Sequence, residues 1–350
     1  MQPLEASTMF KATNDLLLDV DELSVGVNVA GREIGVLSNV SFNVGKGEIV
    51  GVVGESGCGK SLTALAIIGL LGDNVRITGG TITLDGERIS SLSSTQMRKI
   101  RGSRIGMIFQ EPMVALNPLM RVGRQVKEVL VIHAIGNRKS RKARVLELFR
   151  QVGLPDPKLR YRQFPHQLSG GMRQRVMIAM ALAAEPKLLI ADEPTTALDV
   201  TVQAQILDLL EDIRTRLGTS VVLVTHDMGV VSEVADRVVV MYAGQVVESA
   251  PVAELFENAR HPYSVGLLGS VFGSNFEESS DELPTISGRV PSIGEVPSGC
   301  PFEPRCENAI DVCRSDRPPA ASVGTNHIVA CWSPVELPRM RLFGKGVESS

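Results

Sequence analysis

The chain has 350 residues and a formal net charge of −3, with 43% apolar and 21% charged residues. This composition is typical of a globular protein with a large core, and it excludes a disordered chain and a broadly basic nucleic-acid-binding protein. No stretch reaches the roughly 18–20 consecutive apolar residues of a membrane-spanning helix, and Met1–Ser7 lacks the features of a secretory signal. We therefore expect two domains, without a transmembrane segment or signal peptide.

The N-terminal part predicts β-structure. Residues 1–15 are polar and are expected to form a flexible lead-in. Two strands around a glycine-containing turn are then predicted at Leu16–Val29 and Val36–Val44. A third is predicted at Thr81–Leu84, where polar and apolar residues alternate. These strands are expected to form an antiparallel β subdomain. A short apolar run, Glu48–Val53, predicts a separate strand that is buried in a parallel sheet.

The segment after this buried strand fits the pattern G-x-x-x-x-G-K-[ST], and the apolar helical pattern of Leu62–Leu71 follows it. Glycines allow a tight turn in which backbone N–H groups converge on phosphate oxygens, and the helix N-terminus adds partial positive charge. Lys60 is expected to reach the β- and γ-phosphates, and Ser61 to coordinate Mg²⁺. We name this segment the phosphate loop and predict that all its residues bind nucleotide: Gly54, Glu55, Ser56, Gly57, Cys58, Gly59, Lys60 and Ser61. The Cys58 side chain is interpreted as a spacer.

The middle of the chain alternates between helical and extended patterns. Buried strands are predicted at Ile105–Phe109, Lys187–Ala191 and Thr219–Thr225, and a final hairpin at Arg237–Glu248. Residues 111–175 contain proline breaks followed by apolar residues at helical spacing, which predicts a helical insert. The pattern therefore indicates an α/β fold with a mostly parallel sheet.

Two carboxylates, Asp192 and Glu193, follow the third buried strand. At the end of such a strand Asp192 would lie beside Ser61 and hold Mg²⁺ through water. Glu193 would face the γ-phosphate and polarise the attacking water. The alternative is a strand that merely ends in solvated acids, and the phosphate loop disfavours it.

Leu168–Arg175 predicts a second anion site. Ser169 is a good helix N-cap, Gly170 and Gly171 permit close backbone approach, and an apolar helix follows that is predicted to continue over Val176–Ala184. One nucleotide does not need two such sites. We therefore expect this site to face a nucleotide held by a second subunit.

Taken in order, these segments resemble the motifs of ABC-type ATPases over residues 16–250. The corresponding elements are Gly54–Ser61 as Walker A, Gln110 as the Q-loop, Leu168–Gly171 as the signature, Asp192–Glu193 as Walker B, Ala197–Asp199 as the D-loop and His226 as the switch histidine. The resemblance implies a P-loop NTPase core that hydrolyses ATP with Mg²⁺.

The resemblance also implies roles for single residues. Gln110 would contact Mg²⁺ and the attacking water, His226 would contact the γ-phosphate, and Asp199 would belong to the nucleotide site. Ser169, Gly170 and Gly171 would bind the γ-phosphate of the opposite subunit. The sequence departs from the family at Val25–Val29, which lacks the aromatic residue that often stacks on adenine.

Residues 251–350 form an expected C-terminal extension. It is predicted to be loop-rich, because 284–319 holds seven of the 19 prolines. His261–Ser264 and Gly299–Cys306 resemble the extension of dipeptide and oligopeptide transport ATPases of the D type. That resemblance implies an ATPase subunit that powers peptide import, although nickel, sugars or glutathione remain alternative cargoes.

The same resemblance implies partners and a location. The partners would be a second homologous ATPase in a heterodimer, two membrane permeases and an extracytoplasmic peptide-binding protein. The chain would lie peripherally on the cytoplasmic side of the cell inner membrane.

The rival class is a non-transport ABC ATPase that acts on DNA, chromosomes or translation. Only about 110 residues separate Lys60 from Ser169, which leaves no room for a coiled-coil arm. The chain also lacks a basic surplus, so no nucleic-acid partner is expected.

Four of the five cysteines lie in the extension. Thiolate ligands from loops can bind a [4Fe–4S] cluster or Zn²⁺. The intervals between these cysteines differ from the two to four residues that separate paired ligands in structural zinc sites. The family resemblance favours an iron–sulfur cluster as a structural clip, with zinc or unliganded thiols as alternatives. The predicted ligands are Cys300, Cys306, Cys313 and Cys331.

Overall fold

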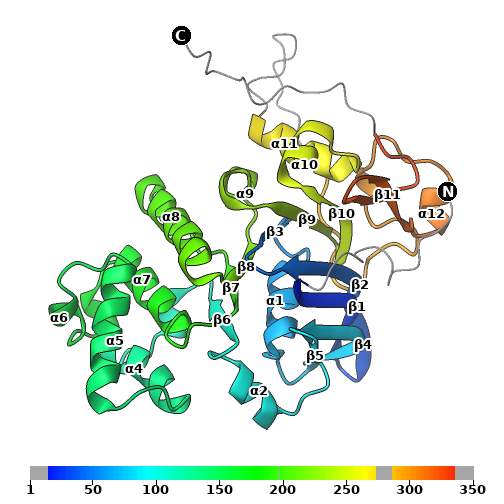
Figure 1. Cartoon of the computed structure of the whole chain (residues 1–350). Coiled ribbons are helices and arrows are strands. Elements are labelled where there is room, and N and C mark those ends of the chain that lie inside the picture. The colour runs from blue at the N-terminus through cyan, green and yellow to red at the C-terminus, as the bar shows by residue number, and fades with distance from the viewer. Residues whose placement is uncertain (1–14, 197, 273–285, 336–350) are drawn as a thin grey trace, which may run out of the picture.

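The computed structural model describes residues 15–196, 198–272 and 286–335. Figure 1 shows a central sheet with a group of helices on one side, and with a second sheet and the C-terminal extension on the other. Of the expected lead-in, residues 1–15, only Asp15 lies within the described residues. That prediction therefore falls outside what the structure describes.

The N-terminal strands form an antiparallel sheet of four strands in the order β2-β1-β4-β5. Its strands are β1 (Leu16–Val29), β2 (Arg32–Gly45), β4 (Val75–Leu84) and β5 (Glu87–Arg88). The predicted antiparallel subdomain is confirmed, but β4 begins at Val75 rather than Thr81. The earlier start arises because Val75 pairs with Val27 of β1, a contact distant in sequence that local alternation does not encode.

The second sheet has eight strands in the order β11-β12-β10-β9-β3-β8-β7-β6. Its five parallel strands are β3 (Ile49–Val53), β6 (Ile105–Ile108), β7 (Leu188–Asp192), β8 (Ser220–Val224) and β9 (Arg237–Tyr242). All predicted buried strands are therefore present. Because they run parallel, their carboxyl ends lie along one edge of the sheet.

Helices cover both faces of this sheet. Those beside the parallel strands are α1 (Lys60–Ile68), α2 (Ser94–Ile100), α8 (Val200–Leu217) and α9 (Met228–Val234). In β7, Leu188 and Ile190 pack in the core that contains α1, whereas Leu189 and Ala191 pack in the core that contains α8. Burial on both faces explains why these strands are continuous apolar runs in the sequence.

The expected insert is helical. Its elements are α3 (Pro112–Ala115), α4 (Val122–Ile132), α5 (Arg138–Gln151), α6 (Pro157–Arg160), the 3₁₀ turn η2 (Pro165–Gln167) and α7 (Gly170–Ala181). The prediction that α7 continues to Ala184 is wrong. A turn closed by the Glu185 N–H and the Leu182 carbonyl, 3.0 Å apart, ends the helix and leads the chain toward β7. Among the described residues, no helix combines the length and the apolar character needed to cross a membrane.

The C-terminal extension continues the main sheet. Its elements, with the strand that leads into it, are β10 (Gln245–Pro251), α10 (Val252–Asn258), α11 (Pro262–Phe272), the 3₁₀ turn η3 (Glu303–Arg305), α12 (Val312–Ser315), β11 (Ala320–Gly324) and β12 (His327–Ala330). The predicted hairpin of β9 and β10 is present, and β12 pairs antiparallel with β10. The prediction of a loop-rich region missed the β11–β12 hairpin, because that hairpin pairs with a strand far away in sequence.

A buried polar cluster fastens this hairpin to β10. His327 Nε2 lies 2.7 Å from Glu248 Oε1, and both residues are about 1% exposed. Glu248 also accepts the backbone N–H groups of Arg260 and His261 at 2.7 and 2.9 Å. A buried carboxylate needs such donors to offset the loss of water, so the cluster fixes how the extension docks.

Candidate nucleotide-binding site

The phosphate loop adopts a conformation that requires its glycines. Gly54, Gly57 and Gly59 have φ values of 148°, 83° and 105°, a region that L-residues rarely adopt. A Cβ atom at Gly54 would also lie only 2.2 Å from the carbonyl oxygen of Met241. The backbone can therefore fold tightly between β3 and α1, as the motif predicts.

The Lys60 side chain lies folded over this loop. Its Nζ donates to the carbonyl oxygens of Gly54 and Glu55 at 2.7 and 3.0 Å, and the residue is 5% exposed. Reaching a phosphate requires the ammonium group to exchange these two bonds. The Cys58 thiol lies 3.7 Å from Nζ and is fully buried, and burial raises its pKa. A buried thiol with a raised pKa is unreactive, in agreement with a spacer role.

Ser61 and Asp192 meet across the sheet. Ser61 Oγ donates to Asp192 Oδ1 at 3.0 Å, so the start of α1 is joined to the end of β7. Asp192 is 6% exposed, and burial raises its pKa, while the Ser61 hydrogen bond acts in the opposite direction. Hydroxyl and carboxylate oxygens are ligands that Mg²⁺ prefers. These two predicted metal ligands are therefore brought together, and they fit the ion.

Glu193 is the centre of a second polar cluster. Its Oε2 accepts hydrogen bonds from Gln110 Nε2 and Thr196 Oγ1, each at 2.9 Å, and its Oε1 lies 3.2 Å from His226 Nδ1. Gln110, Glu193 and His226 follow β6, β7 and β8, which are neighbours in the sheet. The carboxyl ends of these parallel strands thus bring together the three residues predicted to be catalytic.

The environment of Glu193 keeps its carboxylate ionised. Burial alone would raise its pKa, but hydrogen bonds from Thr196 and His226, with the Lys60 charge, outweigh burial and lower the pKa below its usual value. The residue also has a φ of 47°, which a non-glycine residue rarely adopts. Its backbone N–H donates to the Val224 carbonyl at 2.9 Å and holds this strained turn in place.

The predicted second anion site lies apart from the phosphate loop of the same chain. Ser169 caps α7, its Oγ accepting the Met172 N–H at 3.4 Å, and both Ser169 and Gly170 are exposed. Figure 1 shows α7 among the helices of the insert, with α1 on the far side of the main sheet. The exposed Ser169 and Gly170 at the N-terminal end of α7 are therefore available to another subunit, whereas Gly171 is half-buried.

The predicted D-loop residue Asp199 has a local role as a helix cap. Its Oδ1 accepts the Val202 N–H at 2.9 Å at the start of α8. Val200, the next residue, is 84% exposed. Ala197, the first residue of the predicted motif, lies outside the described residues.

Three further residues belong to the site, although the sequence motifs did not predict them. Thr196 supports Glu193, and its place three residues further along the same turn was the available signal. Arg305 and Tyr263 both contact Glu55 of the phosphate loop. They lie in His261–Ser264 and Gly299–Cys306, the two segments that carry the resemblance of the extension.

The four cysteines of the extension lie in one neighbourhood. Cys300 and Cys313 are buried, and their backbones are joined by an N–H···O bond of 2.8 Å. Burial raises the pKa of Cys331 to about 12, and the proximity of Cys306, Cys300 and Cys313 adds to the rise. Within the described ranges, however, no three His, Cys, Asp or Glu side chains form a group that could hold a metal ion.

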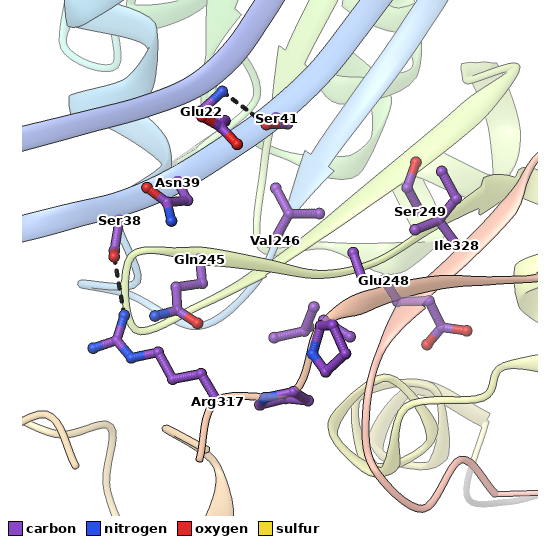
Figure 2. A pocket seen from close by; sticks show the side chains of 15 residues that line it. Glu22, Ser38, Asn39, Ser41, Gln245, Val246, Glu248, Ser249, Arg317 and Ile328 are labelled. Atoms are coloured by element: carbon purple, nitrogen blue, oxygen red, sulfur yellow. Dashed lines mark hydrogen bonds between the residues drawn. The ribbon is translucent and has the colours of Figure 1, made fainter. Parts of the chain in front are cut away.

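A separate cavity of about 240 Å³ lies where the antiparallel sheet meets the extension (Figure 2). Arg317 and Ser38 both line it, and the Arg317 guanidinium donates to Ser38 Oγ at 2.9 Å. None of the cavity's 15 lining residues belongs to the phosphate loop or to the Glu193 cluster. It is therefore not part of the candidate nucleotide site.

Comparison with known proteins identifies the class of this chain. A family model described as ABC transporter matches residues 37–196. The dimeric ATP-binding cassette MJ0796, solved in a post-hydrolysis state with ADP and Pi, is 31% identical and superposes with a TM-score of 0.62. That match covers 67% of this chain and 99% of the cassette. The fold and the site thus define an ABC ATPase.

Further matches place the chain within this class. A model of the oligopeptide/dipeptide transporter C-terminal region matches residues 247–313. The dipeptide transport ATP-binding protein DppD of Bacillus subtilis is 47% identical over 90% of this chain and 94% of its own length. The oligopeptide transport ATP-binding protein OppD of Salmonella typhimurium is 43% identical over 95% and 98%. The chain belongs to the family of oligopeptide/dipeptide ABC transporter ATP-binding subunits, which confirms the resemblance seen in the sequence.

Proposed function

We propose that this chain binds ATP with Mg²⁺ at the phosphate loop and hydrolyses it to drive import of di- and oligopeptides. The observation that carries the proposal is the convergence of Gln110 and His226 on the ionised Glu193. The Ser61–Asp192 pair supports the binding of Mg²⁺ nearby. When bound, Mg²⁺ would neutralise phosphate charge, with Gln110 as a further ligand.

Glu193 acts as the general base in the proposed reaction. Its carboxylate takes a proton from water while the water oxygen attacks the γ-phosphorus, and the bond to the β–γ bridging oxygen breaks to release ADP and phosphate. Gln110 orients the water, and His226 contacts the γ-phosphate. Lys60 exchanges its carbonyl partners for the β- and γ-phosphates, where its charge stabilises the transition state.

Each nucleotide is proposed to lie between two ATPase subunits. Exposure of Ser169 and Gly170 supports this arrangement, because their helix end and backbone N–H groups are free to bind an anion. The similar cassette MJ0796 is itself described as dimeric. We propose a heterodimer with a second homologous ATPase, in which Ser169, Gly170, Gly171 and Asp199 complete the partner's site.

A surface next to Gln110 supports contact with membrane permeases. Met113, Val114 and Leu119 follow this glutamine and are 50%, 81% and 85% exposed. Exposed apolar clusters of this kind mark protein interaction sites. We propose that two permeases dock here, on the cytoplasmic side of the cell inner membrane, and that an extracytoplasmic peptide-binding protein delivers the cargo.

Reconstitution tests the transport proposal directly. The chain would be purified from detergent-solubilised membranes with its co-purifying permeases and ATPase, and the complex placed in liposomes with the binding protein. We expect di- or oligopeptides to stimulate ATP hydrolysis and to be taken up, whereas nickel, sugars and glutathione would not. Stimulation by one of these other cargoes, with none by peptides, would overturn the proposed substrate class.

The cysteines of the extension are proposed to hold a [4Fe–4S] cluster that clips this region together. Burial raises the pKa of Cys306 and of Cys331, and the neighbouring cysteines of the extension add to the rise. This proximity of the thiols supports a shared site. The resemblance of the extension to that of oligopeptide and dipeptide transport ATPases favours a cluster, with zinc or unliganded thiols as the alternatives.

Chemical analysis tests the cluster. Anaerobic purification followed by iron, sulfide and zinc determination should give iron and sulfide in equal amounts and little zinc. Cys306→Ser should remove them, whereas Cys58→Ser, which changes a buried thiol outside the extension, should not. Stoichiometric zinc, or no metal at all, would support one of the alternatives instead.

A further inference from the structure

The extension reaches into the phosphate loop through one ion pair. Arg305 Nη1 and Nη2 donate to Glu55 Oε2 and Oε1 at 2.7 and 3.0 Å, a two-pronged pairing across 250 positions of sequence. Glu55 is the second residue of the phosphate loop, and Arg305 directly precedes Cys306. A single side chain therefore joins the cysteine-bearing region to the loop expected to bind ATP.

Several contacts besides Glu55 fix the position of the Arg305 side chain. It is 4% exposed, and its Nε donates to the Ser287 carbonyl at 2.8 Å. The guanidinium carbon lies 5.7 and 5.9 Å from the ring centroids of Tyr242 and Phe302. Glu55 raises the pKa of Arg305, so the group stays charged. This pairing has the planar, buried form that makes arginine–carboxylate contacts strong.

A second contact fixes the backbone of the same residue. The Glu55 N–H donates to the hydroxyl oxygen of Tyr263 at 2.8 Å. Tyr263 is fully buried, and its ring centroid lies 4.7 Å from that of Tyr242 and 5.4 Å from that of Phe302. The aromatic core of the extension thus holds both the main chain and the side chain of Glu55.

The position of Glu55 matters for binding a phosphate chain. Lys60 Nζ donates to the Glu55 carbonyl, so a shift of Glu55 also moves the partner of the phosphate-binding lysine. The Glu55 carboxylate is moreover a negative charge within a loop that must accept a highly anionic ligand. Neutralisation by Arg305 removes a repulsion that would be strong in a partly buried site.

We propose that Arg305 is a positioning residue for the nucleotide site, through which the cysteine-bearing extension sets the affinity for ATP. It holds the phosphate loop in its binding conformation and cancels the charge of Glu55. This inference rests on the proposed function, namely ATP binding at this loop. Arg305 does not contact the reacting atoms, and its effect is transmitted by Glu55 alone.

Binding measurements on the full chain test this proposal. Titration with ATP and ADP would compare the unaltered chain with Arg305→Gln, Glu55→Gln and the double variant. The matched control is Arg314→Gln, because Arg314 pairs with Glu303 in the same region at 3.2 Å but is 73% exposed. We expect Arg305→Gln to weaken ATP binding about tenfold, and ADP binding less because ADP carries less charge. Adding Glu55→Gln should restore ATP affinity to within about threefold of the unaltered chain.

The outcomes separate this proposal from a merely structural role and from the proposed function. If Arg305 only fastens the extension, the double variant binds ATP no better than Arg305→Gln, and the proposal is overturned. Equal ATP affinity of Arg305→Gln and the unaltered chain also overturns it. If the unaltered chain itself binds no ATP, the proposed function fails. Should Arg305→Gln not fold, Arg305→Lys and Tyr263→Phe serve instead. Each is expected to weaken ATP binding about threefold. If either variant binds ATP as tightly as the unaltered chain, the proposal is overturned.

Discussion

The imidazole Nδ1 of His226 lies 3.2 Å from Glu193 Oε1, although the two residues are 33 positions apart. Gln110 donates to the other carboxylate oxygen, so both oxygens of Glu193 have protein partners. A base that is already oriented by its neighbours loses little freedom during the reaction. Glu193 is therefore oriented for the role of the base.

Glu193→Gln keeps the shape of the side chain and removes the base. We expect it to bind ATP with unchanged affinity and to hydrolyse it about 10²–10⁴ times more slowly, because proton transfer is lost. It should also accumulate with its partner as an ATP-bound closed dimer, detectable by size-exclusion chromatography. Glu233→Gln, at an exposed position of α9, is the control. Normal phosphate release by Glu193→Gln would show that another group is the base.

Lys60→Ala removes the only positively charged side chain of the phosphate loop, Gly54–Ser61. We expect ATP affinity to fall about 10- to 100-fold, as for the loss of charge-assisted hydrogen bonds. Fluorescent-nucleotide titration measures the change. Lys187→Ala, which breaks an exposed ion pair with Asp85, should leave the affinity unaltered. An equal loss in both variants would mean that general charge, rather than the loop, binds the nucleotide.

Ser169→Asp separates helix capping from ligand binding. Aspartate caps a helix as well as serine does, so α7 should stay intact, but its charge would repel a phosphate. In the assembled transporter we expect hydrolysis at the partner's site to be lost while the chain's own loop still binds ATP. Ser169→Thr keeps the hydroxyl and should stay active. The isolated chain should hydrolyse slowly, and turnover on the order of 1–10 s⁻¹ without a partner would contradict the shared site.

Acid pH should destabilise the extension through His261. Burial lowers its pKa to about 4, despite nearby Glu248, and its Nδ1 accepts the Tyr263 N–H at 3.0 Å. The unfolded chain takes up this proton near pH 6.5, so stability is full above that pH. It should fall by up to about 3 kcal/mol as the pH drops from 6.5 to 4.

Urea unfolding at pH 7.5, 6 and 5 measures this effect against a variant that cannot titrate there. His261→Asn retains an acceptor near the Nδ1 position but has no proton to gain. Its free energy of unfolding should therefore change less with pH than that of the unaltered chain. Parallel pH profiles of the two proteins would rule out His261 as the cause.

The local pattern of the chain predicted much of the fold. The burial of β3, β7 and β8 on both faces produces continuous apolar runs, and the glycines of the phosphate loop occupy positions where other residues would be strained. Such constraints act on neighbouring residues and can be seen without coordinates. The order of the motifs along the chain then indicated the family, and with it the role of Glu193. The boundaries of β4 and α7 were predicted less well, because pairing with β1 and a turn toward β7 decide them.

The tertiary structure decided which distant residues meet. The order of strands β6, β7 and β8 brings Gln110 and His226 to Glu193, and no local pattern encodes that order. The β11–β12 hairpin exists because β10 offers an edge with which to pair. Arg305 reaches Glu55 because the aromatic core of the extension packs beside the phosphate loop. The sequence alone thus determined the motifs and the family, whereas contacts between segments far apart in the chain, which arise only from packing, determined how the extension and the nucleotide site are joined.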